Sequence, residues 1–318
     1  MIRQLKFLVQ DFLTFFRKDF HIAAYLYVFI IVGTFIGLIY GTEWGEQITY
    51  SRIPTPFPIL NNILMYLLIY FLVAIPVACI KKETGKLRNP LFYIKAILIT
   101  SLIGFADAFS WREVLQLPSL TAEEQNYIFR TLWRMRNAVF VIPVLVLLRL
   151  FIDKNVKGLY GLCSGNHHVK AYLYLYVVIL PVLIIVSFTP DFLSYYPSYK
   201  PWNYENAFGN PVWLNTLIFE TVYMSDFLMV ELIFRGALVI GMVSLMGRNA
   251  VLPMIAVYVA LHFGKPVLET ISAFFGGYFL GALAFQTRHI WGGVIIHMGI
   301  ALIIELLRFF QHYVLGIG

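Results

Sequence analysis

Long apolar runs, separated by short polar connections, follow one another along most of the chain. They lie near residues 22–40, 59–80, 92–110, 137–152, 171–189 and 212–247. Most of them reach roughly 20 residues, the length that a helix needs to cross the hydrocarbon core of a bilayer. A shorter apolar segment at 250–263 precedes two further runs, near 267–285 and 290–310. We therefore predict an all-α, polytopic transmembrane helix bundle of about eight spans, in which 250–263 either crosses the membrane or dips partway.

The composition supports this prediction. Of the 318 residues, 60% are hydrophobic and only 13% are charged. A soluble domain cannot bury so much apolar surface, so we expect membrane lipids to be the solvent for much of it. The alternating strands of about 10 residues that build outer-membrane barrels are not evident in the sequence. Helices are therefore expected throughout.

The predicted helices fall into three groups. Residues 1–21 mix phenylalanines with basic residues, a pattern typical of an amphipathic helix that lies in the membrane interface. Residues 22–210 hold the N-terminal transmembrane helices. Residues 211–318 hold a C-terminal transmembrane core.

The basic residues predict how the chain is oriented. The net charge is +7, but the lysines and arginines form short clusters between apolar runs, so they are better explained as orientation signals than as a nucleic-acid surface. We predict no nucleic-acid partner and a cytoplasmic N-terminus. One set runs against this pattern and is expected on the outer side: Arg112, Arg130, Arg134 and Arg136.

Ionisable residues are concentrated in the C-terminal third. A charge at bilayer depth costs roughly several kcal/mol on most scales, so each one requires a partner, a cavity or a function. Glu231 and Arg235 lie one helical turn apart on the same face, and the simplest interpretation is a neutralising ion pair. The full set in or beside apolar helices is Glu220, Asp226, Glu231, Arg235, His262, Glu269, His297 and Glu305.

Three short motifs in this third resemble a known family. The CPBP family of intramembrane proteases, which includes CAAX proteases and bacteriocin-processing enzymes, is identified by Glu-Glu-x-x-x-Arg, then Phe-x-x-x-His, then His-x-x-x-Asn on successive helices. The corresponding residues here are Val230, Glu231 and Arg235, then Tyr258 and His262, then His297 and Ala301. The resemblance covers roughly residues 211–305. It implies a membrane endopeptidase that acts on membrane-associated peptides or proteins, such as C-terminal prenylated segments.

Two positions depart from the family pattern. In the family, the first glutamate and the second-motif histidine are thought to activate a water, while the last histidine and the asparagine stabilise the oxyanion. Val230 stands in place of that glutamate and cannot accept a proton. Ala301 stands in place of the asparagine, and losing one oxyanion donor costs about 10² to 10³ in rate. The missing base is the more serious departure.

Another carboxylate is needed if the chain is a peptidase. Glu269 is the leading substitute, because a bend between Gly264 and Pro266 would bring it toward His262, although pairing with Lys265 is an equally simple explanation. Asp226, one turn before Val230, is the second candidate. The residues expected to carry the chemistry are Glu231, Arg235, His262, Glu269 and His297.

The cofactor and the function each keep alternatives at this point. His262, His297 and one carboxylate would match the His₂Glu type of catalytic zinc centre, but no His-Glu-x-x-His motif is present, so a divalent metal such as zinc stays a possibility. The first functional hypothesis is an intramembrane endopeptidase of the inner (cytoplasmic) membrane of a prokaryote. The second is a catalytically inactive relative that binds a membrane partner or peptide, and the third is a channel or transporter.

Overall fold

The computed structural model describes residues 2–42, 58–163, 169–204 and 207–317. Within these ranges the chain forms helices and no β-strand. Seven of the described helices are long and apolar enough to cross a membrane, or eight if the bent pair over 122–151 counts as one span. The predicted all-α polytopic bundle of about eight spans is confirmed, and the chain is an integral membrane protein.

The helices follow the predicted runs closely. The long ones are α2 (Ile22–Gly41), α4 (Pro58–Ile80), α5 (Pro90–Ala108), α9 (Val169–Val186), α11 (Val212–Glu231), α14 (Val267–Thr287) and α15 (Trp291–Tyr313). The others are α1 (Ile2–Asp19), α6 (Trp111–Val114), α7 (Ala122–Arg134), α8 (Ile142–Phe151), α10 (Pro190–Tyr195), α12 (Val243–Met246) and α13 (Val251–Ala260). Two π-helical segments are η2 (Asn137–Val141) and η5 (Leu232–Ala237). Single 3₁₀ turns are η1 (Thr84–Arg88), η3 (Pro201–Asn203), η4 (Ala207–Gly209), η6 (Ile240–Met242) and η7 (Gly247–Ala250).

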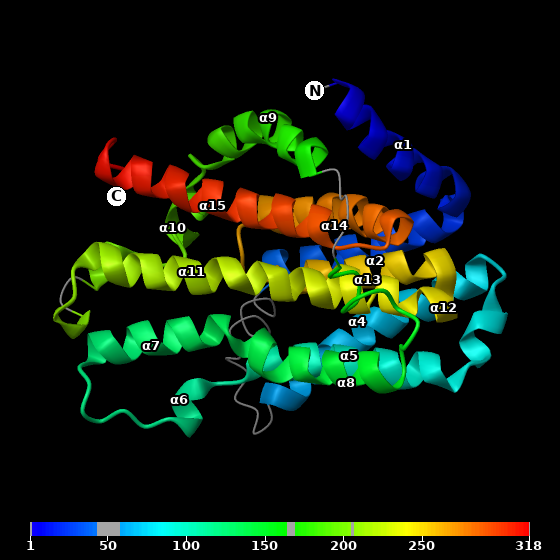
Figure 1. Ribbon diagram of the computed structural model, residues 1–318, viewed down its shortest axis with the longest axis horizontal. Coiled ribbons are helices and arrows are strands. Elements are labelled where there is room, and N and C mark those ends of the chain that lie inside the picture. The colour runs from blue at the N-terminus through cyan, green and yellow to red at the C-terminus, as the bar shows by residue number, and fades with distance from the viewer. Residues whose placement is uncertain (1, 43–57, 164–168, 205–206, 318) are drawn as a thin grey trace.

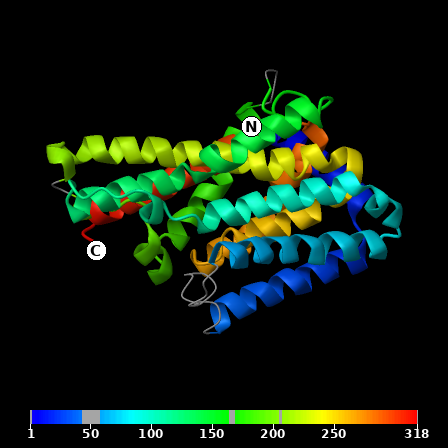
Figure 2. The same ribbon diagram turned by 90° about the horizontal axis from the view of Figure 1, so that it is seen from below.

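Most of the long helices run along the long axis of the molecule (Figures 1 and 2). Helix α4 packs against α5 and α13, α13 packs against α14, and α15 lies beside α9 and α11. The end of α1, the turn between α4 and α5, and α12 lie at one end of the bundle, whereas α6 and the start of α7 lie toward the other (Figure 1). The basic residues at the end of α1 (Arg17 and Lys18) and those of the α4–α5 turn, which a cytoplasmic N-terminus would place on the inner side, therefore share one end. Which side of the membrane that end faces stays a prediction.

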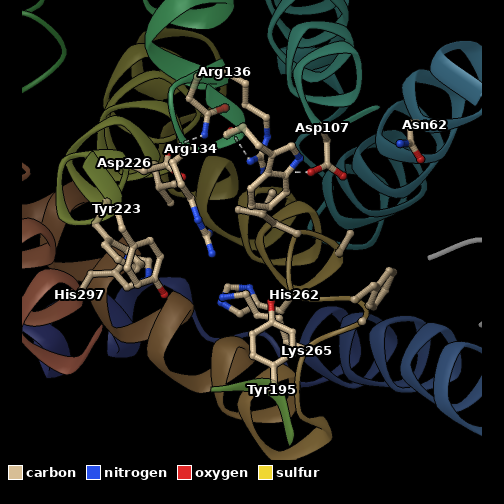
Figure 3. Close-up of a pocket in the computed structure, with 18 of the residues that line it drawn as sticks. Asn62, Asp107, Arg134, Arg136, Tyr195, Tyr223, Asp226, His262, Lys265 and His297 are labelled. Carbon is tan, nitrogen blue, oxygen red and sulfur yellow. Dashed lines mark hydrogen bonds and ion pairs between the residues drawn. The ribbon is translucent and has the colours of Figure 1, made fainter. Parts of the chain in front are cut away.

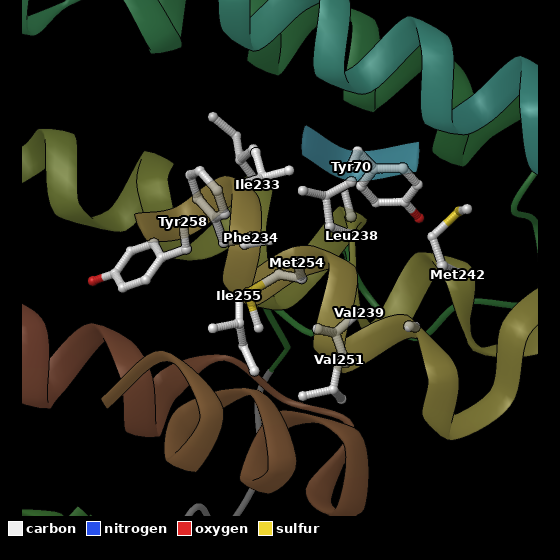
Figure 4. Close-up of a cluster of buried hydrophobic side chains, with 14 of the residues drawn as sticks. Tyr70, Ile233, Phe234, Leu238, Val239, Met242, Val251, Met254, Ile255 and Tyr258 are labelled. Atoms are coloured by element: carbon white, nitrogen blue, oxygen red, sulfur yellow. The ribbon is translucent and has the colours of Figure 1, made fainter. Parts of the chain in front are cut away.

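Helix α13 forms the centre of the bundle. All ten of its residues are buried, and they pack with η5 and α4 in one apolar cluster (Figure 4). A helix that is apolar on every side is surrounded by protein, not by water. Ten helical residues rise about 15 Å, which is about half of the hydrocarbon thickness. Of the two predictions for 250–263, the structure therefore favours a segment that dips partway.

The stretch predicted as one long helix over 212–247 is interrupted. It is α-helical up to Glu231, continues as the π-helical segment η5, and then passes through η6 and α12. The backbone packs closely here, because a Cβ on Gly236 would lie 2.9 Å from the Tyr160 carbonyl oxygen. A buried ion pair between Lys95 and Asp153, 2.7 Å long, holds this region, since Lys95 also donates to the Gly241 carbonyl and Tyr160 donates to Asp153. These contacts hold η5 and η6 in place against the rest of the bundle.

Candidate active site

A cavity of about 350 Å³ lies where α13 ends. Its walls come from α4, α5, α7, η2, α11 and α15, together with the turn at 261–265. His262 and His297 both line this cavity, although they belong to different elements (Figure 3). The structure thus brings together the two histidines that the sequence placed on separate helices.

His262 sits in the turn that follows α13. Its Nδ1 lies 2.8 Å from the Tyr258 carbonyl oxygen. A carbonyl oxygen can only accept, so Nδ1 carries the hydrogen and Nε2 of the neutral ring keeps its lone pair. The backbone of the turn is also fixed, because the His262 carbonyl accepts hydrogen bonds from Tyr40 Oη and Thr270 Oγ1. Nε2 is therefore the ring nitrogen available for proton transfer.

Burial and, to a smaller extent, neighbouring charges set the protonation of His262. Burial lowers the pKa of His262 to about 3, the Lys265 ammonium acts in the same direction, and the Glu269 carboxylate opposes both. The imidazole is therefore neutral at neutral pH. Its proton affinity rises when Glu269 acts on it more strongly than Lys265 does.

Glu269 lies near His262 but is held by other groups. Its Oε1 is 4.0 Å from His262 Nε2 and 2.8 Å from Lys265 Nζ. Tyr196 Oη donates a 2.6 Å hydrogen bond to Oε2. Burial, reinforced by the Glu269 charge, raises the pKa of Tyr196 well above its ordinary value, so Tyr196 remains a donor. Glu269 is not among the residues that line the cavity. Both sequence interpretations are thus realised: the bend brings Glu269 to His262, and Lys265 pairs with it.

Glu231, Arg235 and His297 form a second, drier group. Glu231 is fully buried, and its Oε1 lies 3.0 Å from Arg235 Nη1 and 3.1 Å from His297 Nδ1. Glu231 and Arg235 do not line the cavity, so they reach it only through His297. Gly293 makes this arrangement possible, because a Cβ there would lie 1.9 Å from Glu231 Oε2. The sequence shows this glycine in the pair Gly292–Gly293 that leads into His297, but the room that it makes for Glu231 is visible only in the structure.

The two positions that depart from the family pattern lie in different surroundings. Val230 lines the cavity, where the resemblance implies that a glutamate would face the water. Ala301 is buried in an aromatic cluster with Tyr127 and Tyr223 and does not line the cavity. Tyr258, which stands where the family has phenylalanine, brings its hydroxyl within 3.4 Å of His297 Nε2. The cavity wall is therefore apolar at Val230, where the family has its general base.

Two aspartates supply the carboxylates that line the cavity in the described part of the chain. Asp107 is paired with Arg136 at 3.1 Å. Asp226 Oδ1 accepts a 2.9 Å hydrogen bond from Asn137 Nδ2. Asn137 opens the π-helical segment η2, at the 44° bend between α7 and α8. Irregular helical turns of this kind frequently occur at functional sites.

The side chains do not fit the zinc centre that the histidines suggested. A His₂Glu site needs three ligands around one point. No group of three histidine, cysteine, aspartate or glutamate side chains arranged to hold a metal ion occurs in the described ranges. His297 Nδ1 is already engaged with Glu231. We therefore derive no step through a metal.

Comparison with known proteins gives one match. Residues 211–303 match the model of the family described as type II CAAX prenyl endopeptidase Rce1-like. No curated protein and no solved structure matches the chain. The matched segment contains both histidines, Glu231 and Arg235. The C-terminal segment is therefore similar to this family of CAAX proteases, as the motifs predicted, and at the level of the family this is a peptidase.

Proposed function

We propose that the protein is an intramembrane endopeptidase that cleaves membrane-associated peptides or proteins. The observation that carries the proposal is that His262 and His297 line one cavity within the segment that matches a peptidase family. In both rings Nδ1 is engaged, by the Tyr258 carbonyl and by Glu231 respectively. Nε2 of His262 is therefore left for substrate or water, and Nε2 of His297 lies 3.4 Å from the Tyr258 hydroxyl, on the side where a substrate oxygen could replace that contact.

In the proposed reaction His262 is the general base. Its Nε2 takes a proton from water while the water oxygen bonds to the carbonyl carbon of the scissile peptide. When the C–N bond breaks, that proton passes to the departing amine nitrogen, and the ring returns to its neutral form. Glu269, 4.0 Å from Nε2, stabilises the imidazolium that exists between these steps.

His297 polarises the carbonyl oxygen in this scheme. With Nδ1–H bonded to Glu231, the ring can donate from Nε2 only after it gains a proton, and the Glu231 carboxylate 3.1 Å away is the group that would stabilise that cation. Arg235 lies 3.0 Å from Glu231 and orients it, so both act through His297. The Tyr258 hydroxyl, 3.4 Å from His297 Nε2, is close enough for both groups to donate to one oxygen.

Two carboxylates compete for the place of the missing glutamate. Glu269 is closer to His262, but Lys265 and Tyr196 occupy its oxygens. Asp226 lines the cavity and keeps Oδ2 free of the Asn137 contact. We favour Glu269 as the partner of His262, with Asp226 as a carboxylate that orients water.

The proposal predicts that purified protein in lipid nanodiscs cleaves members of a membrane-anchored peptide library, some of them prenylated near the C-terminus. His262→Gln and His297→Gln should each lower the rate by about 10² or more, as general acid–base and oxyanion groups do. His312→Gln is the matched control, because its ring stacks on Trp202 away from the cavity. Mass spectrometry of the products gives the rates.

The same experiment decides between a peptidase and an inactive relative. Val230 and Ala301 favour the second candidate, a non-catalytic member that binds a membrane peptide. Equal background cleavage by the wild type and all three variants would refute the peptidase proposal. Peptide binding without cleavage would then support the inactive relative.

A further inference from the structure

Arg134 is the last residue of α7 and lies outside the segment that matches the family. It lines the cavity beside His262 and His297, and its guanidinium points into the space toward His262 (Figure 3). None of the family motifs requires an arginine at this place. Its role must therefore be read from its own surroundings.

The guanidinium is held in position by neutral groups. It donates to Ser198 Oγ and lies over the Tyr223 ring, 4.2 Å from the centroid. Trp133 offers a second ring at 4.8 Å. Stacking on aromatic faces and a hydroxyl contact fix the plane of the side chain without neutralising its charge. The fork of donors is thus oriented before any ligand arrives.

The other cations of the cavity already have partners. Arg136 pairs with Asp107 at 3.1 Å, and Lys265 pairs with Glu269 at 2.8 Å. For Arg134, in contrast, no carboxylate oxygen of the described residues lies within 4.0 Å of a guanidinium nitrogen, not even that of Asp226 in the same cavity. The carboxylates of Glu220 and Glu305 act on Arg134 only from beyond this distance. The partly buried guanidinium thus lacks a direct anionic partner, and a ligand that carries an anion would supply one.

We propose that Arg134 binds a carboxylate of the peptide that occupies the cavity. This inference rests on the proposed function, because it assigns the substrate of the same site. The planar guanidinium matches a carboxylate with two parallel hydrogen bonds. A volume of about 350 Å³ is at the small end of ligand sites and suits a few residues of a peptide. The carboxylate is either the C-terminus or an acidic side chain near the cleaved bond.

A peptide is favoured over a lipid phosphate by the position of the guanidinium. Arg134 shares one enclosed space with both histidines. An anion bound there brings the chain that carries it to the proposed reacting groups. A lipid headgroup at the same point would instead occupy the place of the substrate.

The test measures binding, so it does not depend on cleavage. Fluorescent apolar peptides that differ in one group are titrated into His262→Gln protein in phosphatidylcholine nanodiscs: a C-terminal acid, the C-terminal amide, and the amide with one internal aspartate. At least one carboxylate peptide should bind about tenfold or more tightly than the plain amide, as expected for a charged hydrogen-bonded pair. Which one does so identifies the source of the carboxylate.

Arg134→Gln should abolish this preference while leaving the affinity for the amide unchanged. Arg130→Gln, one turn earlier on α7 and outside the cavity lining, should retain it. If Arg134→Gln does not fold, Arg134→Lys keeps the charge without the fork and should lose part of the preference. Equal binding of acid and amide peptides to the parent protein would overturn the inference, as would full competition by phosphatidylglycerol. Selective binding by His262→Gln together with no cleavage of the same peptides by the wild type would overturn the proposed function alone.

Discussion

Two imidazole–carboxylate pairs adjoin the cavity, and their carboxylates differ in distance and exposure. Glu231 and His297 belong to long helices and meet at 3.1 Å, and the carboxylate is fully buried with Arg235 as its counterion. Glu269 and His262 meet across a turn at 4.0 Å, and 21% of the Glu269 side chain is exposed. The first carboxylate is thus close to its histidine and shielded from solvent, whereas the second is farther from its histidine and partly exposed.

The difference suggests a division of labour. A buried carboxylate between a guanidinium and an imidazole has no proton to exchange with solvent, so it suits orientation and charge stabilisation. A looser pair that shares its carboxylate with an ammonium and a tyrosine suits proton transfer, because small movements change which cation the carboxylate serves. Three changes to the chain would break or sharpen this contrast.

The largest effect is expected from Glu231→Gln. It leaves Arg235 buried without a counterion, and breaking a buried pair in this way costs about 3–5 kcal/mol. Glu269→Gln is the matched comparison, because Lys265 is partly exposed and its charge can reach water. The midpoint temperature of thermal unfolding in nanodiscs should fall strongly for Glu231→Gln and only slightly for Glu269→Gln. Equal falls would mean that the two pairs are equally structural.

A second change restores a carboxylate at position 230, where the family has a glutamate and this chain has Val230. Val230→Glu places an acid on the cavity wall, where a general base typically contributes about 10² to 10⁴ in rate. Peptide cleavage should increase by about 10², and Val230→Gln, which is similar in size but has no charge, should give no increase. Turnover measured against the same peptide library tests this. No gain from either variant would show that the base is not what limits the wild type.

The smallest effect is expected from Lys265→Gln. The Lys265 ammonium contributes to the lowered pKa of His262, which burial mainly causes, so its removal should raise that pKa from about 3 toward its ordinary value. The neutral base would then be lost at a higher pH as the solution is acidified. NMR titration of labelled histidine follows the midpoint directly, with Lys157→Gln, on a different loop, as the control. An unchanged midpoint would separate Lys265 from the chemistry.

The sequence predicts the helices far better than it predicts the partners within the site. Apolar runs identify spans because length and composition are local properties, and motif order was enough to bring His262 and His297 to one cavity. The pairing of Glu269 with Lys265 was predicted, but the hydrogen bond from Tyr196 was not, because Tyr196 lies far from Glu269 in the sequence. Contacts of that kind depend on how segments far apart in the sequence pack together, and no local sequence pattern predicts this.

The half of the cavity wall built by the N-terminal helices was missed altogether. Asn137, Asp107 and Arg134 come from segments with no recognisable motif. Arg134 and Arg136 were read only as part of an outer charge cluster. They line the cavity because the chain bends at η2. A π-helical turn cannot be recognised from the hydropathy of the sequence. That Arg134, next to this bend, lines the cavity can be recognised only from the packed structure.

The short length of α13 has a further consequence for the space available in the site. The helix stops after ten residues, and its last residue, Ala260, lines the cavity. Extending α13 by one or two turns would therefore push its own backbone into that space and close the site from within.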